Sequence, residues 1–182
     1  MNADTAIDKD NLKRQYQKVG FSPAVIDGLV KAHECVFQKG TSTGWEWVVS
    51  VNCSTGEFMG EPHTNKKPGT VTWRHEGNIA GVHNHPENTP PSDIDIFSFS
   101  LNKEARALSV QGHNGCFYVL TRNKKDSTTL TLSNIQDKID TTVLKDCFKA
   151  LSCPQKFEIA VKSIASDMNW GFLKGGGRNE KK

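Results

Sequence analysis

The chain has 182 residues, of which 36% are hydrophobic and 24% are charged, and its nine phenylalanines and four tryptophans can fill a core. These values suit one folded domain and exclude a chain that is disordered throughout. No apolar stretch approaches the roughly 18 residues that a membrane-spanning helix needs.

The net charge of +3 is concentrated at the C-terminal end of the chain. Residues 174–182 contain four basic residues and one acidic residue, so residues 1–173 are formally neutral. A nucleic-acid binder neutralises phosphates with an excess of Lys and Arg. The neutral body therefore argues against nucleic acid as a partner.

The N-terminus and the cysteines bear on the cellular compartment. Residues 1–8 are polar and acidic, without the basic start and apolar run of a secretory signal. The five cysteines are an odd number and include no CxxC pair, which is typical of reduced thiols. We expect a cytoplasmic protein, and export by a signal-independent machine stays open.

Two helices are predicted before the first strand. Asp10 can cap a short helix over about residues 11–19. A longer helix begins at Ser22 and Pro23, a cap followed by proline at the first helical position. Apolar residues then recur at helical spacing until Gly40, where we expect this helix to end.

Strands are predicted next. Residues 45–51 are rich in aromatic and β-branched side chains, and residues 57–59 should pair back on them as a hairpin. A short strand is expected over residues 70–73. Residues 79–82 are apolar and lead directly into His83, which indicates a buried strand that ends at a site.

A proline-rich loop over residues 86–91 should separate that strand from the next helix. Ser92 is a good N-cap, and it predicts a helix over about residues 93–101. Residues 107–111 and 116–121 have the pattern of a β-hairpin around a Gly- and Asn-containing turn.

The last third of the chain is expected to be mainly helical. Residues 128–132 predict one more strand, and helices should follow over about residues 133–151 and 154–168. Residues 174–182, with three consecutive glycines and a charged end, indicate a flexible tail.

The residues that carry chemistry surround the loop after the buried strand. His83 and His85 are two positions apart, so in an extended chain their imidazoles point to the same side. Pro86 then turns the chain away and leaves the site open. Ser92 and Asp95 are three apart, which places both on one face of a first helical turn. Asp95 can therefore face the same point as the two histidines.

Two neutral imidazoles and one carboxylate suit Zn²⁺ and leave a fourth position for water, as in catalytic zinc sites. Zinc lowers the pKa of such a water to roughly 7. A carboxylate beside the water would take its proton and pass it to a leaving amine. Glu46, at the start of the first predicted strand, is a candidate for that carboxylate, and Asp93 is a rival to Asp95 as ligand.

At this point the sequence resembles a known family. Glu46, followed by His83-Asn84-His85-Pro86 and then Ser92-Asp93-Ile94-Asp95, is similar to the JAMM motif of the JAB/MPN-domain metalloproteases. The string His-Asn-His-Pro with Pro-Ser-x-x-Asp also resembles the RadC-type branch of that fold. The resemblance covers roughly residues 22–121.

The resemblance implies a role for each of five residues. His83, His85 and Asp95 would bind zinc, Glu46 would act as the acid/base on the zinc-bound water, and Ser92 would help to hold the oxyanion. It also implies the fold: an MPN (JAB/JAMM, cytidine-deaminase-like) α/β domain with a curved mixed sheet flanked by helices.

The chain departs from the family pattern in two places. Residues 86–91 form a shorter link between the second His and the Ser than is usual, and the stretch between Glu46 and His83 is also shorter than in many relatives. Glu57, Glu76 and Glu34 therefore stay open as alternatives to Glu46.

The expected organisation has four parts. Residues 1–21 form an N-terminal extension, residues 22–125 a JAB/MPN-like core, residues 126–173 a helical C-terminal extension of the same domain, and residues 174–182 a basic tail.

The resemblance implies zinc-dependent hydrolysis of a peptide or isopeptide bond, with a protein, a peptide or a ubiquitin-like conjugate as substrate. A DNA-associated RadC-like protein without protease activity and a non-catalytic MPN scaffold are the alternatives. The formally neutral body argues against the first, and the retained ligand residues argue against the second.

Overall fold

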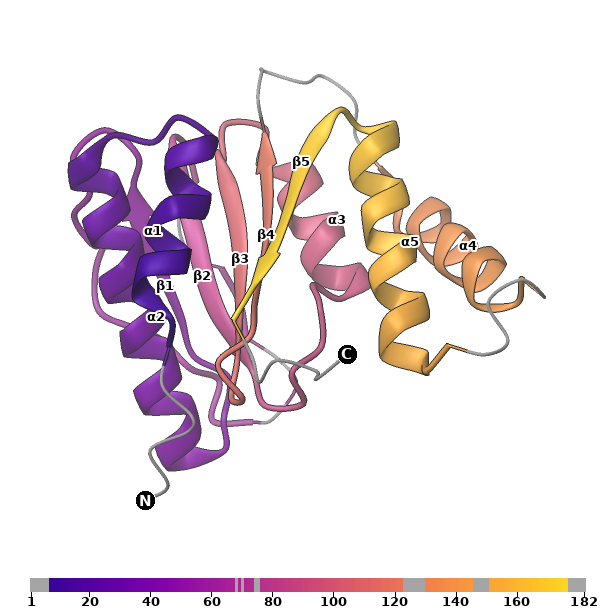
Figure 1. The fold of residues 1–182 in the computed structure, drawn as a ribbon, viewed down its shortest axis with the longest axis horizontal. Helices are drawn as coiled ribbons and strands as arrows, with labels where there is room; N and C mark the ends of the chain where they lie inside the picture. The colour runs from indigo at the N-terminus through magenta and orange to yellow at the C-terminus, as the bar shows by residue number, and fades with distance from the viewer. Residues whose placement is uncertain are drawn as a thin grey trace.

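The computed structural model describes residues 7–67, 69, 71–73, 76–122, 130–145 and 151–176. Over these residues the chain forms a five-stranded mixed sheet with helices on both faces (Figure 1). The expectation of an α/β fold with a mixed sheet flanked by helices is thereby confirmed. The finer assignment to the MPN fold stays a prediction, as do the four proposed parts of the chain.

The strands lie across the sheet in chain order. Neighbouring strands are antiparallel except for β2 and β3, which are parallel because a helix carries the chain back between them. The strands are β1 (Val48–Asn52), β2 (Ile79–His85), β3 (Ala107–Gly112), β4 (Phe117–Arg122) and β5 (Trp170–Gly175).

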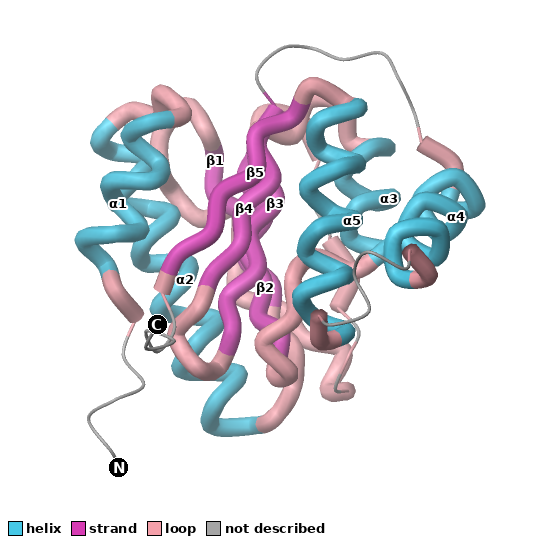
Figure 2. The backbone as a smooth tube through the Cα atoms, turned by 45° about the vertical axis from the view of Figure 1, so that its right-hand side comes forward, coloured by secondary structure: helices cyan, strands magenta, loops and turns pink. Residues whose placement is uncertain are grey.

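Helices α1 (Lys9–Lys18) and α2 (Pro23–Thr43) cover one face of the sheet (Figures 1 and 2). Their apolar side chains pack on the sheet in one core cluster, and burial of this apolar surface is the main stabilising contribution. The buried side chains from the two helices are Leu12, Tyr16, Val25, Ile26, Leu29, Val30, Ala32 and Val36.

The caps of these helices agree only in part with the sequence-based expectations. Ser22 caps α2 as predicted, but the cap of α1 is Asp8 rather than Asp10. Helix α2 also continues through Gly40 and ends at Gly44, whose φ of 73° is the left-handed conformation that commonly closes helices. Gly44, and not the predicted Gly40, therefore ends α2.

Helices α3 (Asp93–Leu101) and α5 (Cys153–Asp167) cover the opposite face, and α4 (Leu132–Val143) packs against these two helices on the side away from the sheet (Figures 1 and 2). The prediction for α3 is confirmed at both ends and that for α5 within a residue. Helix α4 ends at Val143, well before the predicted residue 151. Side chains from all three helices contribute to a second core cluster on this face, including Ile96, Phe99, Ile135, Ile139, Val161 and Ile164.

The strands before the site differ in extent from their predictions. β1 begins at Val48 rather than at residue 45, so Glu46 precedes the ladder. The predicted hairpin partner over residues 57–59 pairs back through a single bridge between Val51 and Phe58. The predicted strand over residues 70–73 is wrong for residues 71–73, which belong to no strand, and residue 70 lies outside the described part.

The C-terminal predictions need two corrections. The strand expected over residues 128–132 is not formed at its described residues, because residues 130 and 131 are irregular and Leu132 begins α4. The predicted tail begins too early, because Lys174 and Gly175 belong to β5 and pair with β4. Residues 177–182 lie outside the described part. No helix in the described ranges is long and apolar enough to cross a membrane.

Candidate metal centre

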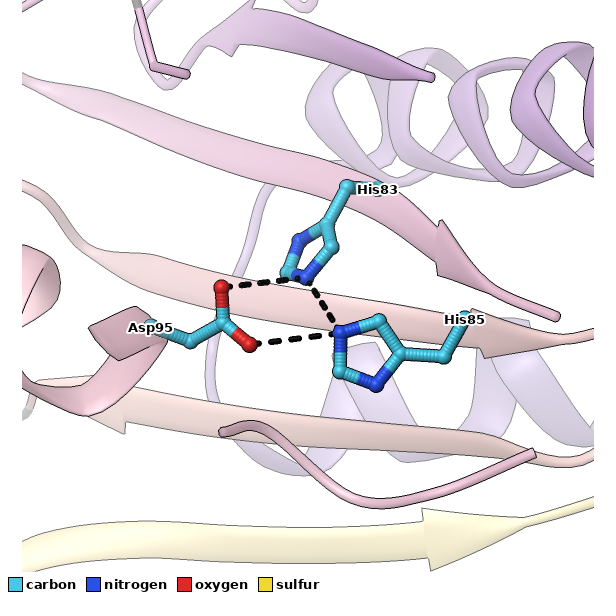
Figure 3. A group of neighbouring side chains, drawn as sticks. All are labelled: His83, His85 and Asp95. Atoms are coloured by element: carbon cyan, nitrogen blue, oxygen red, sulfur yellow. Dashed lines mark hydrogen bonds and ion pairs between the residues drawn. The ribbon is translucent and has the colours of Figure 1, made fainter. Parts of the chain in front are cut away.

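The three predicted ligands meet at the end of β2. His83 and His85 project from the same side of the strand, and Asp95 comes from the first turn of α3 (Figure 3). The two Nε2 atoms are 3.0 Å apart, and each lies 3.2 Å from a different carboxylate oxygen of Asp95. These residues form a group whose ligand atoms all lie within 4.8 Å of one another and could hold a metal ion.

The hydrogen bonds of His85 suit metal binding. Its Nδ1 lies 3.1 Å from the Thr89 carbonyl oxygen and 3.0 Å from the Thr89 hydroxyl. A carbonyl can only accept, so Nδ1 carries a proton, and Nε2 is the nitrogen that faces His83 and Asp95 and could bind a metal. A second hydrogen bond of this kind fixes the tautomer of a metal-binding histidine. The donor set therefore fits a divalent cation.

The electrostatics of the group favour a carboxylate anion beside the imidazoles. Burial opposes ionisation of Asp95, but the neighbouring His83 and His85 outweigh it and hold the pKa of this carboxyl well below its usual value. Burial also opposes protonation of His85, yet the carboxylates of Asp95 and Glu46 raise its pKa. Asp95 is thus held in the ionised form, the form in which a carboxyl binds a cation.

Ser92 orients the ligand carboxylate. Its backbone N–H and its hydroxyl both donate to Asp95 Oδ2 at 2.7 Å, and the Asp95 N–H donates back to Ser92 Oγ at 3.2 Å. This reciprocal pair is a capping box, which satisfies free N–H groups at the start of α3. The role of Ser92 toward an oxyanion stays a prediction, and its contact with Asp95 is an additional function.

A cavity of about 360 Å³ opens beside the ligands. Its lining includes Glu46, His85, Ser92 and Asp95, four of the five residues that the resemblance selects. The cavity thus lies against the open side of the candidate metal group, where a substrate could reach it.

Glu46 is buried, with 6% of its surface exposed. Burial raises the pKa of its carboxyl, the nearby His85 and His83 act in the opposite direction, and Asp95 raises the pKa further. A carboxyl whose pKa is raised can accept a proton and return it near neutral pH. The structure thus brings Glu46 to the cavity, although the sheet begins only at Val48.

The rival acids lie outside the candidate metal group. Glu57 is exposed at the turn after β1, and Glu34 forms an ion pair with Lys9 of α1. Glu76 is exposed and lines a neighbouring cavity, which shares Asp95 with the first cavity but includes neither histidine in its lining. Asp93 lines the cavity beside the candidate metal group, but its carboxylate accepts a hydrogen bond from Gln136 of α4 at 3.0 Å, and the group contains Asp95 in its place.

Sequence analysis did not find a series of buried hydrogen bonds between the sheet and helices α1 and α2. Ser109 Oγ lies 2.6 Å from the Tyr16 hydroxyl, which lies 2.9 Å from His33 Nε2. The other ring nitrogen, Nδ1, lies 2.9 Å from Gln111 Oε1. Because the amide oxygen can only accept, Nδ1 donates and Tyr16 donates to Nε2. His33 had no partner spacing in the sequence because its partners come from α1 and β3.

Sequence analysis also gave no role to Asn84, although it stands between the two candidate ligand histidines. Its side-chain oxygen accepts the Trp47 N–H at 2.8 Å, and its amide nitrogen donates to the Trp45 carbonyl at 3.0 Å. The only signal in the sequence was its position within His-Asn-His-Pro.

Comparisons of the chain with protein-family models, curated proteins and solved structures found no match. The similarity to the JAMM motif therefore depends on the motif residues themselves.

Proposed function

We propose that this chain is a zinc-dependent hydrolase of the JAMM type that cleaves a peptide or isopeptide amide bond. One observation supports this proposal above the others. Glu46 lines the same cavity as His85 and Asp95, so an acid/base candidate and a metal-binding group face one space.

His83, His85 and Asp95 would hold the ion. Their two imidazoles and one carboxylate match the ligands that zinc takes in hydrolases. When bound, zinc would supply Lewis-acid chemistry, acidifying a water and polarising the scissile carbonyl. Ser92 would fix the Asp95 carboxylate through its two hydrogen bonds at 2.7 Å.

Glu46 would move the proton. Its carboxyl is buried at the cavity wall, where the raised pKa suits removal of a proton from water and its delivery to the leaving amine. Ser92 lines the same cavity, and its hydroxyl would turn from Asp95 Oδ2 to donate to the developing oxyanion, while its N–H keeps the carboxylate in place. The substrate class would be a protein or peptide, including ubiquitin-like conjugates.

The test separates metal binding from turnover. Glu46→Gln should keep about one zinc per chain and lose roughly 10²–10⁴-fold in kcat on a panel of quenched-fluorescent linear and lysine-branched peptides. Glu57→Gln is the matched control, because Glu57 is an exposed acid at the turn after β1, and it should change neither quantity. Undiminished turnover in Glu46→Gln would refute the acid/base role, and a zinc-free wild-type protein would refute the metalloenzyme.

A further inference from the structure

Asn84 is completely buried between the two candidate ligands on β2. Successive side chains of a strand point to opposite faces, so its amide lies on the face away from His83 and His85. There it forms hydrogen bonds with Trp45 and Trp47, the residues on either side of Glu46. Asn84 thus connects the strand of the histidines to the segment of the candidate acid.

The sheet alone does not fix Glu46. The β1 ladder begins at Val48, and the Glu46 N–H reaches only the Lys67 carbonyl at 3.5 Å. Asn84 supplies three contacts to the residues on either side: its Oδ1 accepts from Trp47 N, its Nδ2 donates to Trp45 O, and its own backbone N–H donates to Trp47 O at 3.2 Å.

The amide of Asn84 has one orientation in this position. A flipped amide would place its oxygen against the Trp45 carbonyl and its NH₂ against the Trp47 N–H, losing both bonds. The second Nδ2 hydrogen faces His113 Nε2 at 2.9 Å. On the remaining side α2 approaches so closely that a Cβ on Gly40 would lie 2.3 Å from Nδ2.

We propose that Asn84 is the positioning residue of this site. By holding the peptide groups before and after Glu46, it sets the place of the Glu46 carboxylate relative to the metal ligands. The inference rests on the proposed function, because it assigns what positions the acid/base of that reaction. Only a carboxamide offers one acceptor and two donors in this geometry, so neither aspartate nor leucine can replace it.

The first experiment needs no substrate. Cobalt(II) is loaded into the wild type, Asn84→Ala, Glu46→Gln, the double variant and Asn52→Ala, and visible spectra are compared. Asn52 is the matched control, because its side chain accepts from the Ser54 N–H in the turn after β1. We expect Asn84→Ala to change the same bands as Glu46→Gln, the double variant to equal Glu46→Gln, and Asn52→Ala to match the wild type.

Amide hydrogen exchange shows whether the segment is held. The Trp47 amide should exchange at least about tenfold faster in Asn84→Ala, while amides of the β3–β4 pair keep their rates. A wild-type cobalt spectrum or an unchanged Trp47 rate in Asn84→Ala would overturn the positioning role. Failure of the wild type to bind cobalt, or a Glu46→Gln spectrum identical to wild type, would instead refute the proposed function and this inference with it.

A double-mutant cycle on the peptide panel adds the kinetic evidence. If Asn84 acts through Glu46, Asn84→Ala should lower kcat by about 10–100-fold with zinc retained, and in the Glu46→Gln background it should cost less than about twofold more. Losses that multiply would show an independent role and overturn the inference. Should Asn84→Ala not fold, Asn84→Ser takes its place in every arm.

Discussion

Acid should destabilise this protein through His33, which is completely buried beneath the sheet. Burial lowers the pKa of His33 from 6.5 to about 4, although the hydrogen bond to Gln111 favours the charged form. Tyr16 donates to one ring nitrogen and Gln111 accepts from the other, so the folded protein accommodates the neutral imidazole. The unfolded chain has no such constraint, and its histidine takes up a proton near the ordinary pKa.

Between the two pKa values the unfolded chain therefore binds a proton that the folded chain does not bind. The free energy of unfolding must fall as the pH falls through this window. A pKa of about 4 in place of 6.5 corresponds to about 3 kcal/mol of lost stability at the acid end of the window. Below the lower pKa, His33 adds no further loss.

Urea unfolding of the wild type and His33→Gln, in chelator and from about pH 7 to about pH 4, measures this contribution. The difference between the two stabilities should change by about 3 kcal/mol across the series, with the wild type losing more. Parallel losses in the two proteins would refute the assignment, because His33 would then contribute nothing to the pH dependence.

Three further perturbations test the site and the fold. His85→Ala should reduce bound zinc from about one per chain to nearly none by mass spectrometry of the metal, and full retention would remove His85 from the ligand set. Gly40→Ala should cost roughly 1–3 kcal/mol in urea unfolding despite the better helix propensity of alanine, because its Cβ would strike Asn84; a stabilised variant would contradict that contact. A chain ending at Leu173 should melt roughly 2–8 °C below one ending at Gly176, since it lacks the last pairs of β5, and equal melting temperatures would show that those pairs contribute nothing.

The candidate site could be predicted from the sequence better than strand β5 and the end of helix α2. His83 and His85 could be found because they are two positions apart directly after an apolar run. Ser92 marks the start of α3 because it caps that helix. Both signals are local, so each could be found without knowledge of the fold. Glu46 was one candidate acid among several, the family resemblance then selected it, and the structure places it at the same cavity.

The missed features depend on contacts between distant segments. β5 contains Gly171 and Gly175, which have poor strand propensity, yet both lie where a Cβ would meet a neighbour: Thr121 Oγ1 at 2.3 Å from Gly171, and the Phe117 ring at 2.5 Å from Gly175. Gly40 was wrongly expected to end α2; it lies inside the helix, where a Cβ would meet the side chain of Asn84. In each case the sequence shows a glycine but not the neighbour that requires it.

All three candidate ligands lie between residues 83 and 95, whereas Glu46 comes from a different part of the chain. If the proposed function holds, binding the ion and using it for catalysis depend on separate segments of the chain. Under that proposal, a relative in which only residues 45–47 have changed would lose the activity and keep the strand and helix that bind the ion.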